Sequence, residues 1–292
     1  MKPAPLDYVR PQSVEEAVVA LAAAGPDAKI IAGGQSLMPM INFRMVRPSV
    51  LVDINRIPGL DRIEDLGARF HLGALVRHRM TASDSNIATH LPVLHETMKN
   101  VAHLTVRNRG TFCGSLCHAD PAAEMPMMAL LLNGIVHIAS QAGNRSVPAR
   151  EFLVSSLTTA LTAGEMVTGI DIDKLKPGTG WGFEEFARRH GDYALASVAM
   201  TMERRDGRAH DVRVAVMGLG DTAARIAEVE NCLEDRPVTD ALIADAVMLL
   251  REKIEPNEDM NGSADYRRHL AGVLASRVLK AAWGRAAAGR AS

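Results

Sequence analysis

The stretch Ile30-Ile31-Ala32-Gly33-Gly34-Gln35-Ser36-Leu37 determines how the fold is interpreted. Two β-branched residues lead into a small residue, a glycine pair and a serine, which predicts a buried strand ending in a tight loop. Glycine permits positive φ and lets another group come close to the backbone N–H groups. Successive N–H groups in such a loop form a nest for an anion such as a phosphate. Taken alone, a plain turn is the commoner explanation of a glycine pair.

A second loop has a similar character and strengthens the case for an anion site. It reads Arg109-Gly110-Thr111-Phe112-Cys113-Gly114-Ser115. Two glycine loops can hold the two phosphates of one dinucleotide through their backbone N–H groups. The pair therefore favours nucleotide binding over two unrelated turns.

The composition is that of a globular chain with balanced charge. The 292 residues carry 33 basic and 34 acidic side chains, a net charge of −1, and 47% are hydrophobic. No basic stripe interleaved with aromatic residues supports nucleic-acid binding. The apolar runs are too short for a membrane span, and residues 1–6 lack the apolar region of a signal peptide. These features predict a cytoplasmic protein that does not bind nucleic acid and has no membrane span.

Three cysteines, Cys113, Cys117 and Cys232, do not form a disulfide framework in a reducing compartment. Cys113 and Cys117 together with His118 have the wrong spacing for a zinc ribbon, and no second pair exists. An iron–sulfur cluster would require about four cysteines. We therefore predict no metal site in the chain.

Local signals predict an alternating first half. Ser13 and Glu16 form a capping box for a helix that ends at Gly25. The expected strands, from pattern, are 29–32, 48–54, 69–74, 135–139 and 166–172, with a short buried segment at 37–41. Thr81 or Ser83 is expected to cap a short helix. Residues 91–102 are expected to form a longer helix. Asp120 followed by Pro121 is typical of the start of a helix, here running to residue 132.

The pattern changes after residues 174–180, which are polar and rich in turn residues. Two strands, 196–204 and 212–217, are expected to form a hairpin around Asp206-Gly207. Helices are expected at 223–233, 239–254 and 263 to about 287. This second part contains no glycine nucleotide loop of its own.

At this point the chain resembles a known family. Ala32-Gly33-Gly34-Gln35-Ser36 is similar to the AGGxS flavin pyrophosphate motif of the FAD-binding medium subunits of molybdenum hydroxylases, which include the carbon monoxide dehydrogenase medium chain and xanthine dehydrogenase FAD subunits. Thr111-Phe112-Cys113-Gly114 lies where the family carries TIGG. Further similarities follow in the family's order, at residues 2–8, 119–123, 191–194 and 262–267.

The resemblance implies an α+β fold. A two-lobed PCMH-type FAD-binding domain would occupy residues 1–176, with lobes of about 1–55 and 56–176. A flavoprotein C-terminal domain of antiparallel sheet plus helices would occupy residues 177–292. FAD would lie between the two domains, with its pyrophosphate on the two glycine loops.

The resemblance also implies the residues that bind FAD. They are Ile31, Ala32, Gly33, Gly34, Gln35, Ser36, Leu37, Thr111, Cys113, Gly114, Ser115, His118, Asp120, Glu124, Val167 and Tyr193. The loops would give backbone donors, Ser36 and Ser115 hydroxyls, and Tyr193 a ring against the isoalloxazine. No residue of this chain is expected to be a proton-transferring catalyst.

Each of the outlying candidates also has a plain structural explanation. Asp120 is equally explained as a helix cap, Glu124 as a solvated first-turn acid and His118 as a hydrogen-bonded loop histidine. Tyr193 in its polar Gly-Asp-Tyr turn favours a functional surface position. One departure from the family concerns Cys113, where a glycine is expected; we expect the backbone there to tolerate a side chain.

The function implied by the resemblance is electron transfer in an oxidoreductase complex. A large molybdopterin-binding subunit would oxidise the substrate, and a small [2Fe-2S] subunit would pass the electrons to the FAD of this chain. NAD or a quinone would then accept them, and the assembly would be a dimer of heterotrimers, a heterohexamer. A non-redox assembly subunit with a decayed FAD site is the alternative, and a stand-alone flavin oxidase is a third. The substrate, whether carbon monoxide, a purine, another N-heterocycle or an aldehyde, is left open.

Overall fold

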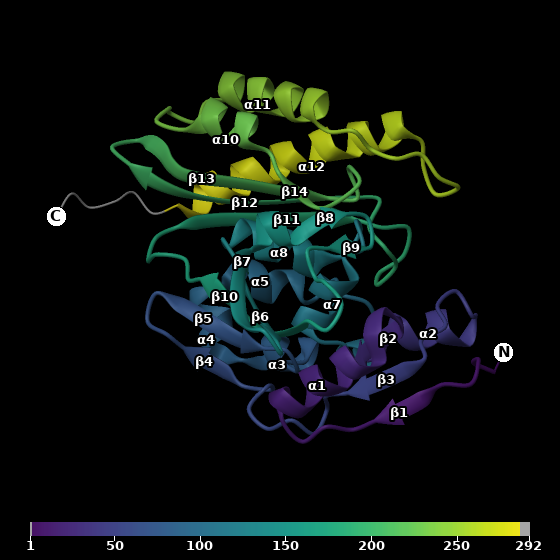
Figure 1. Cartoon of the computed structure of the whole chain (residues 1–292). Coiled ribbons are helices and arrows are strands. Elements are labelled where there is room, and N and C mark those ends of the chain that lie inside the picture. Colours follow the sequence, from purple (N-terminus) through teal and green to yellow (C-terminus); the bar gives the residue numbers. More distant parts are fainter. Residues whose placement is uncertain (1, 287–292) are drawn as a thin grey trace. The chain divides into compact units, whose positions relative to one another are not determined.

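The computed structural model describes residues 2–286, which form two compact units (Figure 1). Unit 1 consists of residues 1–81, 103–118 and 133–173, and unit 2 of residues 82–102, 119–132 and the chain from 174 onwards. Both units are therefore discontinuous in sequence. The expected linear boundary at 176 stays a prediction.

A small parallel sheet forms the first part of unit 1. Its strand order is β1-β3-β2, from Asp7–Val9, Val50–Asp53 and Ala28–Ile31. Between β1 and β2 runs helix α1, Val14–Ala24, followed by a short 3-10 turn, Gly25–Asp27. The predicted strand, loop and strand are thus present, with the first glycine loop directly after β2.

The ends of α1 follow the sequence signals. Ser13 Oγ accepts a hydrogen bond from the Glu16 N–H at 3.1 Å. Glu16 reaches one residue further back than expected, because its Oε2 accepts from the Gln12 N–H at 2.7 Å. Gly25 has φ 73°, the left-handed conformation that suits a glycine after a helix.

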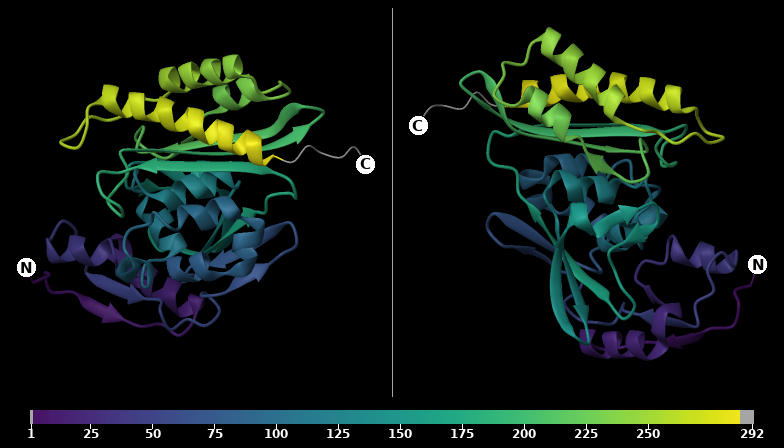
Figure 2. Two further views of the ribbon diagram at one scale, coloured as in Figure 1. Left: turned by 180° about the vertical axis from the view of Figure 1, so that it is seen from behind. Right: turned by 45° about the horizontal axis from the view of Figure 1, so that its top comes forward.

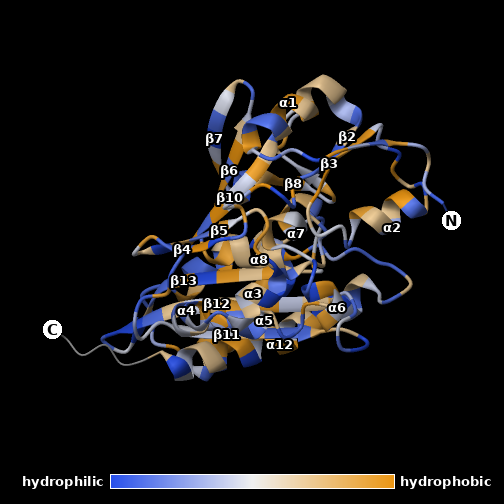
Figure 3. Cartoon of the chain, turned by 90° about the horizontal axis from the view of Figure 1, so that it is seen from below, coloured by the Kyte–Doolittle hydropathy of each residue, from blue (hydrophilic) through white to orange (hydrophobic). Residues whose placement is uncertain are grey.

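A five-stranded antiparallel sheet forms the rest of the unit 1 framework. The order is β4-β5-β10-β6-β7, from Ile63–Asp65, Arg69–Gly73, Met166–Asp173, Ile135–Ser140 and Gly143–Pro148. Figure 3 shows hydrophobic residues recurring along β6 and β10. Phe70, Leu72, Val136, Ile170 and Ile172 are all buried. Their alternation with polar residues leaves the opposite face of the central strands more polar.

Short elements complete unit 1. Helix α2, Leu37–Asn42, follows the first glycine loop, and α7, Phe112–His118, follows the second. The others are α3 (His78–Ser83, whose last residues fall in unit 2), α6 (Leu104–Arg107), α9 (Ala149–Phe152), and strands β8 (Leu153–Ser155) and β9 (Thr158–Thr159).

Unit 2 is built on the antiparallel sheet β11-β12-β13-β14, from Gly180–Phe186, Ala196–Arg205, Arg208–Met217 and Ala224–Arg225. Helix α12, Ala264–Arg285, covers one face, and α5 (Pro92–Thr97) and α8 (Glu124–Leu131) pack on the other (Figure 2). Helices α10 (Ala227–Leu233) and α11 (Asp240–Lys253) lie over α12 and β13, and α4 is Ser85–His90. The antiparallel sheet with helices predicted for this part is confirmed.

The predicted hairpin turn is present in unit 2. Asp206 and Gly207 have φ values of 49° and 75°, and β12 pairs with β13 on either side of them. Positive φ at both central residues is the type I′ arrangement that suits the twist of the strands. The helices expected from 239 and 263 are present, and Thr239 and Ser263 cap α11 and α12 through hydrogen bonds from the Leu242 and Tyr266 N–H groups.

Four local predictions were wrong. Asp120 does not begin a helix, because its Oδ1 accepts from the Ala122 N–H in a turn and α8 starts at Glu124. Asp84, and not Thr81 or Ser83, caps the short helix that follows. Helix α5 ends at Thr97, well before residue 102. Helix α10 starts late because residues 224–225 pair with β13.

The last helix ends close to the limit of the description. Helix α12 ends at Arg285, and residue 287, the expected end, lies outside the described residues. None of the helices within residues 2–286 combines the length and the apolar character that crossing a membrane requires.

Candidate functional site

The two glycine loops lie against each other in unit 1. A Cβ built on Gly33 would be 2.4 Å from the Arg109 carbonyl oxygen and 2.8 Å from the Gly110 Cα. Real Cβ atoms do not approach backbone this closely, so only glycine fits at residue 33. Gly34 has φ 70°, which also favours glycine. The sequence predicted two loops that act together, and the structure brings them into contact.

Two polar side chains connect the loops. Asn55 Nδ2 donates to the Ala32 carbonyl at 2.9 Å, and the Asn55 side-chain oxygen accepts from the Arg77 guanidinium. Arg77 also donates to the Arg109 carbonyl. Burial and the neighbouring Arg109 lower the pKa of Arg77, which still leaves it charged at neutral pH. A continuous hydrogen-bonded chain thus runs from one glycine loop to the other.

The series of hydrogen bonds between the loops is anchored at the end of β3. Asp53 Oδ1 accepts from Asn55 Nδ2 at 2.6 Å and from the Asn55 N–H at 2.9 Å. The Tyr8 hydroxyl donates to the other carboxylate oxygen of Asp53, and Arg10 lies 3.8 Å from it. Although burial alone would raise the pKa of Asp53, these donors lower it overall, so the carboxylate is ionised at neutral pH.

A hollow opens beside the joined loops. Its volume is ≈ 400 Å³, and it is lined by Ile31, Gly33, Gly34, Gln35, Met38, Pro39 and Arg109. Gln35 is exposed, and its Nε2 donates back to the Gly33 carbonyl at 3.2 Å. Four of the predicted residues of the first loop therefore line one cavity, together with an arginine from the second.

The second loop is held in place from below. The His78 N–H donates to the Gly110 carbonyl at 2.9 Å, and the Phe112 N–H donates to the Val76 carbonyl at 3.1 Å. Thr111 is buried, and its Oγ1 accepts from the Gly114 N–H at 3.0 Å. Burial and two nearby arginines lower the pKa of His78 to about 4, so its ring packs as a neutral group.

Cys113, the departure from the family motif, causes no backbone strain. It lies inside α7 and is absent from the residues with positive φ. Its side chain is buried, with Sγ 3.8 Å from the Leu72 carbonyl. Burial raises the pKa of Cys113, and that of Cys117 to about 12, so both stay protonated thiols. The expectation that the backbone tolerates a side chain here is confirmed.

A second group of predicted residues gathers in unit 2. Tyr193 is exposed, and burial of part of its ring together with the carboxylates of Asp120 and Glu124 raises the pKa of its hydroxyl. Glu185 joins them, because burial and then Glu124 raise its pKa to about 8. Its Oε2 is buried and has no hydrogen-bond partner. Asp120, Glu124 and Tyr193 therefore interact electrostatically, and Glu124 also interacts with the carboxyl group of Glu185, whose raised pKa keeps it mostly neutral at pH 7.

The remaining predicted residues are distributed over unit 1. Ser36 and Leu37 lie where the first loop enters α2, and Ser115 and His118 are half-buried in α7. Val167 in β10 is 5% exposed and pairs with Ile138, so its side chain belongs to the core.

Sequence inspection missed Asn55, Arg77 and Glu185. Asn55 had a usable signal, since it follows directly on the strand next to the glycine loop. Arg77 and Glu185 have no motif around them, and only the folded chain shows what they contact.

Comparison with known proteins decides the family. Residues 4–174 match the FAD binding domain in molybdopterin dehydrogenase, and residues 181–282 match the CO dehydrogenase flavoprotein C-terminal domain. The chain belongs to this family of FAD-binding medium subunits. It is an FAD-dependent oxidoreductase subunit of the molybdenum hydroxylase type.

Two relatives match the chain over nearly their whole length. The 6-hydroxypseudooxynicotine dehydrogenase complex subunit alpha of Paenarthrobacter nicotinovorans is 43% identical, over 98% of this chain and 97% of the relative. The carbon monoxide dehydrogenase medium chain of Hydrogenophaga pseudoflava is 34% identical, over 98% and 100%.

Solved structures show the same fold. A chain of the carbon monoxide dehydrogenase from Hydrogenophaga pseudoflava superposes with a TM-score of 0.96 at 36% identity, covering 98% of this chain and 100% of that one. A chain of quinoline 2-oxidoreductase from Pseudomonas putida 86 gives a TM-score of 0.92 at 39% identity, with the same coverage.

The residues present fit the FAD that this family binds. The first loop offers a hollow beside its backbone, and Cys113 turns its side chain into the core and so leaves the second loop unobstructed. When bound, FAD would supply a group that takes up electrons singly or in pairs and releases them again. The chain's own contribution is to hold and orient it.

Proposed function

We propose that this chain is the electron-transfer subunit of a three-component enzyme. A small [2Fe-2S] subunit delivers electrons to its FAD, and NAD or a quinone-type acceptor removes them. A large molybdopterin-binding subunit oxidises the substrate, and two sets of the three chains assemble into a heterohexamer. The observation that carries the proposal is the contact between Gly33 and the Arg109-Gly110 backbone, which joins the two loops of the family's flavin motif.

The proposed FAD-binding residues form two groups. In unit 1 the backbone N–H groups of residues 31–37 and 111–115 hold the pyrophosphate, with the hydroxyls of Ser36 and Ser115, and His118 and Val167 lie further along the cofactor. In unit 2 Asp120, Glu124 and Tyr193 contact the flavin part. The raised pKa of Tyr193 keeps its hydroxyl protonated, so that it remains a hydrogen-bond donor.

We further propose that the substrate is an aromatic N-heterocycle. The names of the relatives at 43% and 39% identity include a nicotine derivative and quinoline, whereas the carbon monoxide enzymes are 30–36% identical. The test is the turnover of the isolated complex with quinoline, nicotine, carbon monoxide and an aldehyde in turn.

Purification of the tagged full-length chain from its own host tests the electron-transfer proposal. We expect a yellow complex that contains two further chains, about one FAD per copy of this chain, molybdenum, and the electron paramagnetic resonance signal of reduced [2Fe-2S] clusters. A colourless chain that still carries both partners, and does not take up added FAD, would establish the assembly subunit in its place. A yellow chain that purifies alone and oxidises a substrate would establish the stand-alone oxidase.

A further inference from the structure

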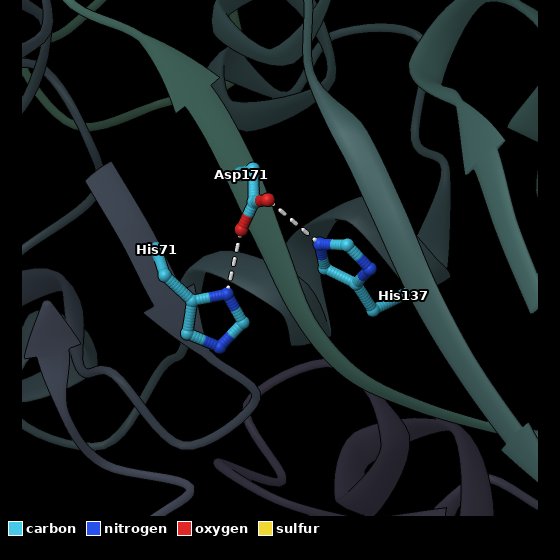
Figure 4. A group of neighbouring side chains, drawn as sticks. All are labelled: His71, His137 and Asp171. Carbon is cyan, nitrogen blue, oxygen red and sulfur yellow. Dashed lines mark hydrogen bonds and ion pairs between the residues drawn. The ribbon is translucent and has the colours of Figure 1, made fainter. Parts of the chain in front are cut away.

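Three side chains converge on the five-stranded sheet of unit 1, in a place that the FAD proposal does not use. His71 Nδ1 lies 2.7 Å from Asp171 Oδ1, and His137 Nε2 lies 3.0 Å from Asp171 Oδ2 (Figure 4). One ligand-type atom from each residue can be chosen so that all three lie within 4.8 Å of one another. The side chains are 27%, 31% and 16% exposed, so an ion can reach them from solvent.

The sheet register explains how they meet. Asp171 is on the central strand β10, directly opposite His71 on β5. His137 on β6 is opposite Gly169, two residues away, where the register shifts between Val167 and Gly169. Side chains two residues apart on one strand share a face of the sheet, so all three residues point to the same side.

Gly169 provides the space for this arrangement. A Cβ built there would be 2.5 Å from His71 Cε1 and 2.6 Å from His71 Nε2. Any side chain would therefore push the imidazole of His71 away from Asp171. Glycine weakens a strand because it has no side chain to pack, so a glycine inside a strand often marks a place where another group lies close to the backbone.

Asp171 differs from the nearby Asp173 in the residues with which its carboxylate pairs. Asp173, the next residue on the same face, accepts from Arg69 at 3.0 Å and from Asn133 Nδ2 at 2.8 Å. Within the described residues, the ion-pair contacts of Asp171 are with the two histidines and with no lysine or arginine.

His137 has a partner on its far side as well. Its Nδ1 lies 2.9 Å from Ser146 Oγ, which comes from the neighbouring strand β7. Without a metal ion, Nε2–H of His137 can donate to Asp171 while Nδ1 accepts from the hydroxyl; when an ion replaces the Nε2 proton, Nδ1–H donates to Ser146 Oγ and the lone pair of Nε2 is free to bind the ion. Such outer partners fix the ring orientation of histidines that bind metals.

We propose that His71, His137 and Asp171 form a binding site for a divalent transition-metal ion, with Zn²⁺ as the best-suited species. The ligands are His71 Nδ1, His137 Nε2 and one carboxylate oxygen of Asp171, and water completes a tetrahedral set. Two imidazoles and a carboxylate are ligand types that Zn²⁺ takes in three-ligand sites. Tetrahedral bonds of about 2.0–2.1 Å place ligand atoms about 3.3 Å apart. Each histidine now lies at hydrogen-bond distance from a different oxygen of Asp171, so both rings must move slightly away from the carboxylate and toward each other to bind the ion.

The test uses the full-length chain with its FAD in place, treated with a chelator and then titrated with ZnCl₂ by calorimetry. We expect one Zn²⁺ per chain, with an affinity that falls at least tenfold in each of His71→Gln, His137→Gln and Asp171→Asn. CoCl₂ should give the visible bands of tetrahedral cobalt, at longer wavelength than the flavin, and ZnCl₂ should remove them. Each variant's thermal unfolding midpoint and flavin content establish that it is folded.

Three control variants make the result decisive. His190→Gln removes an exposed histidine outside the cluster and should leave Zn²⁺ uptake unchanged. Cys117→Ser and Cys232→Ser test the two partly exposed thiols and should also leave it unchanged. Equal Zn²⁺ uptake by wild type and His71→Gln would contradict the proposal, because the cluster would then be a hydrogen-bond network only. Loss of uptake in Cys117→Ser or Cys232→Ser would contradict it as well.

Discussion

The carbonyl oxygen of Arg109 occupies the space that any side chain on Gly33 would need, since a Cβ there would lie only 2.4 Å away. The first prediction concerns this contact. Gly33→Val should separate the two glycine loops and lower the FAD content of the purified chain at least tenfold, because the donors to the pyrophosphate no longer converge. Flavin absorbance relative to protein, measured after gel filtration, provides the check.

Gly284→Ala is the matched control for this substitution. Gly284 lies in α12, and an added Cβ there meets no atom within 4 Å. Its flavin content should equal that of wild type, and its thermal midpoint should be no lower, because alanine is the better helix former. Full FAD occupancy in a folded Gly33→Val chain would contradict the site assignment, and Gly114→Val, which crowds Thr111 Oγ1, gives an independent trial on the second loop.

A second prediction concerns the polar connection between the loops. Arg77→Met keeps much of the length of the side chain but removes its donors to Asn55 and to the Arg109 carbonyl. Losing hydrogen bonds from a charged donor costs on the order of 2 kcal/mol, so FAD should dissociate about 10- to 30-fold more readily. Fluorescence of the released flavin during dilution measures this, and Arg79→Met, which changes an exposed arginine two residues on, should have no effect.

The third prediction is a dependence of stability on pH caused by Glu185. Its pKa rises from the ordinary 4.5 to about 8 on folding, first by burial and second by Glu124. Below about pH 4.5 the carboxyl is neutral in both states; between about pH 4.5 and about pH 8 only the unfolded chain ionises, so the free energy of unfolding falls as pH rises. Above about pH 8 Glu185→Gln should therefore be more stable than wild type, by on the order of 2–3 kcal/mol after allowance for partial exposure.

Urea unfolding at a series of pH values distinguishes the two chains. Their curves should coincide in acid and separate as pH rises through the interval given by the two pKa values. Glu184→Gln changes the adjacent glutamate, which lies 3.4 Å from Arg277 on the exposed α12 side, and should follow wild type throughout. Parallel curves for Glu185→Gln and wild type would show that Glu185 ionises normally.

The fourth prediction concerns Arg145 and Glu165, which join β7 to the segment before β10. Arg145 donates to both carboxylate oxygens, at 2.6 and 2.8 Å, and the Thr162 N–H donates at 2.7 Å. Led by the bonds from Arg145, these donors lower the pKa of Glu165 from 4.5 to about 2. The stabilisation is therefore complete above about pH 4.5 and is lost as pH falls toward about 2.

Arg145→Met should lower the free energy of unfolding at neutral pH by about 1 kcal/mol, and the difference from wild type should vanish in acid. Thermal unfolding followed by circular dichroism measures both. Arg150→Met is the control, because its contact with Glu151 is 3.5 Å long and both side chains are exposed. Equal destabilisation by the two substitutions would mean that the Arg145 pair has no special role.

Local features could be predicted from the sequence wherever neighbouring residues decide the structure. Ser13, Thr239 and Ser263 cap helices because each accepts from an N–H group three residues later. Asp206-Gly207 forms the hairpin turn because both residues tolerate positive φ. The resemblance added what local rules lack, namely that two separate glycine loops belong to one site, and the Gly33–Arg109 contact agrees with it.

Long-range contacts explain what the sequence could not predict. Asp120 carries a helix-start signal, but the Gly218 N–H donates to the Pro121 carbonyl at 2.8 Å, and this contact with a distant strand holds the segment as a turn. The contacts of Arg77 with Asn55 and Arg109, and those of the His71–Asp171–His137 cluster, join segments that are adjacent in space and far apart in sequence. No spacing rule relates such residues before the register of the sheet is known.

The discontinuous make-up of unit 2 has a consequence for how the protein is synthesised. Residues 125–131 of α8 are all buried, and the sheet against which they pack, β12 to β14, begins only at residue 196. The ribosome therefore synthesises this apolar helix well before the strands that it packs against. Helix α5 is likewise synthesised before β11, its partner strand. Nascent chains of this protein expose an incomplete core until translation is nearly finished, the interval in which aggregation competes with folding and chaperones are of most use.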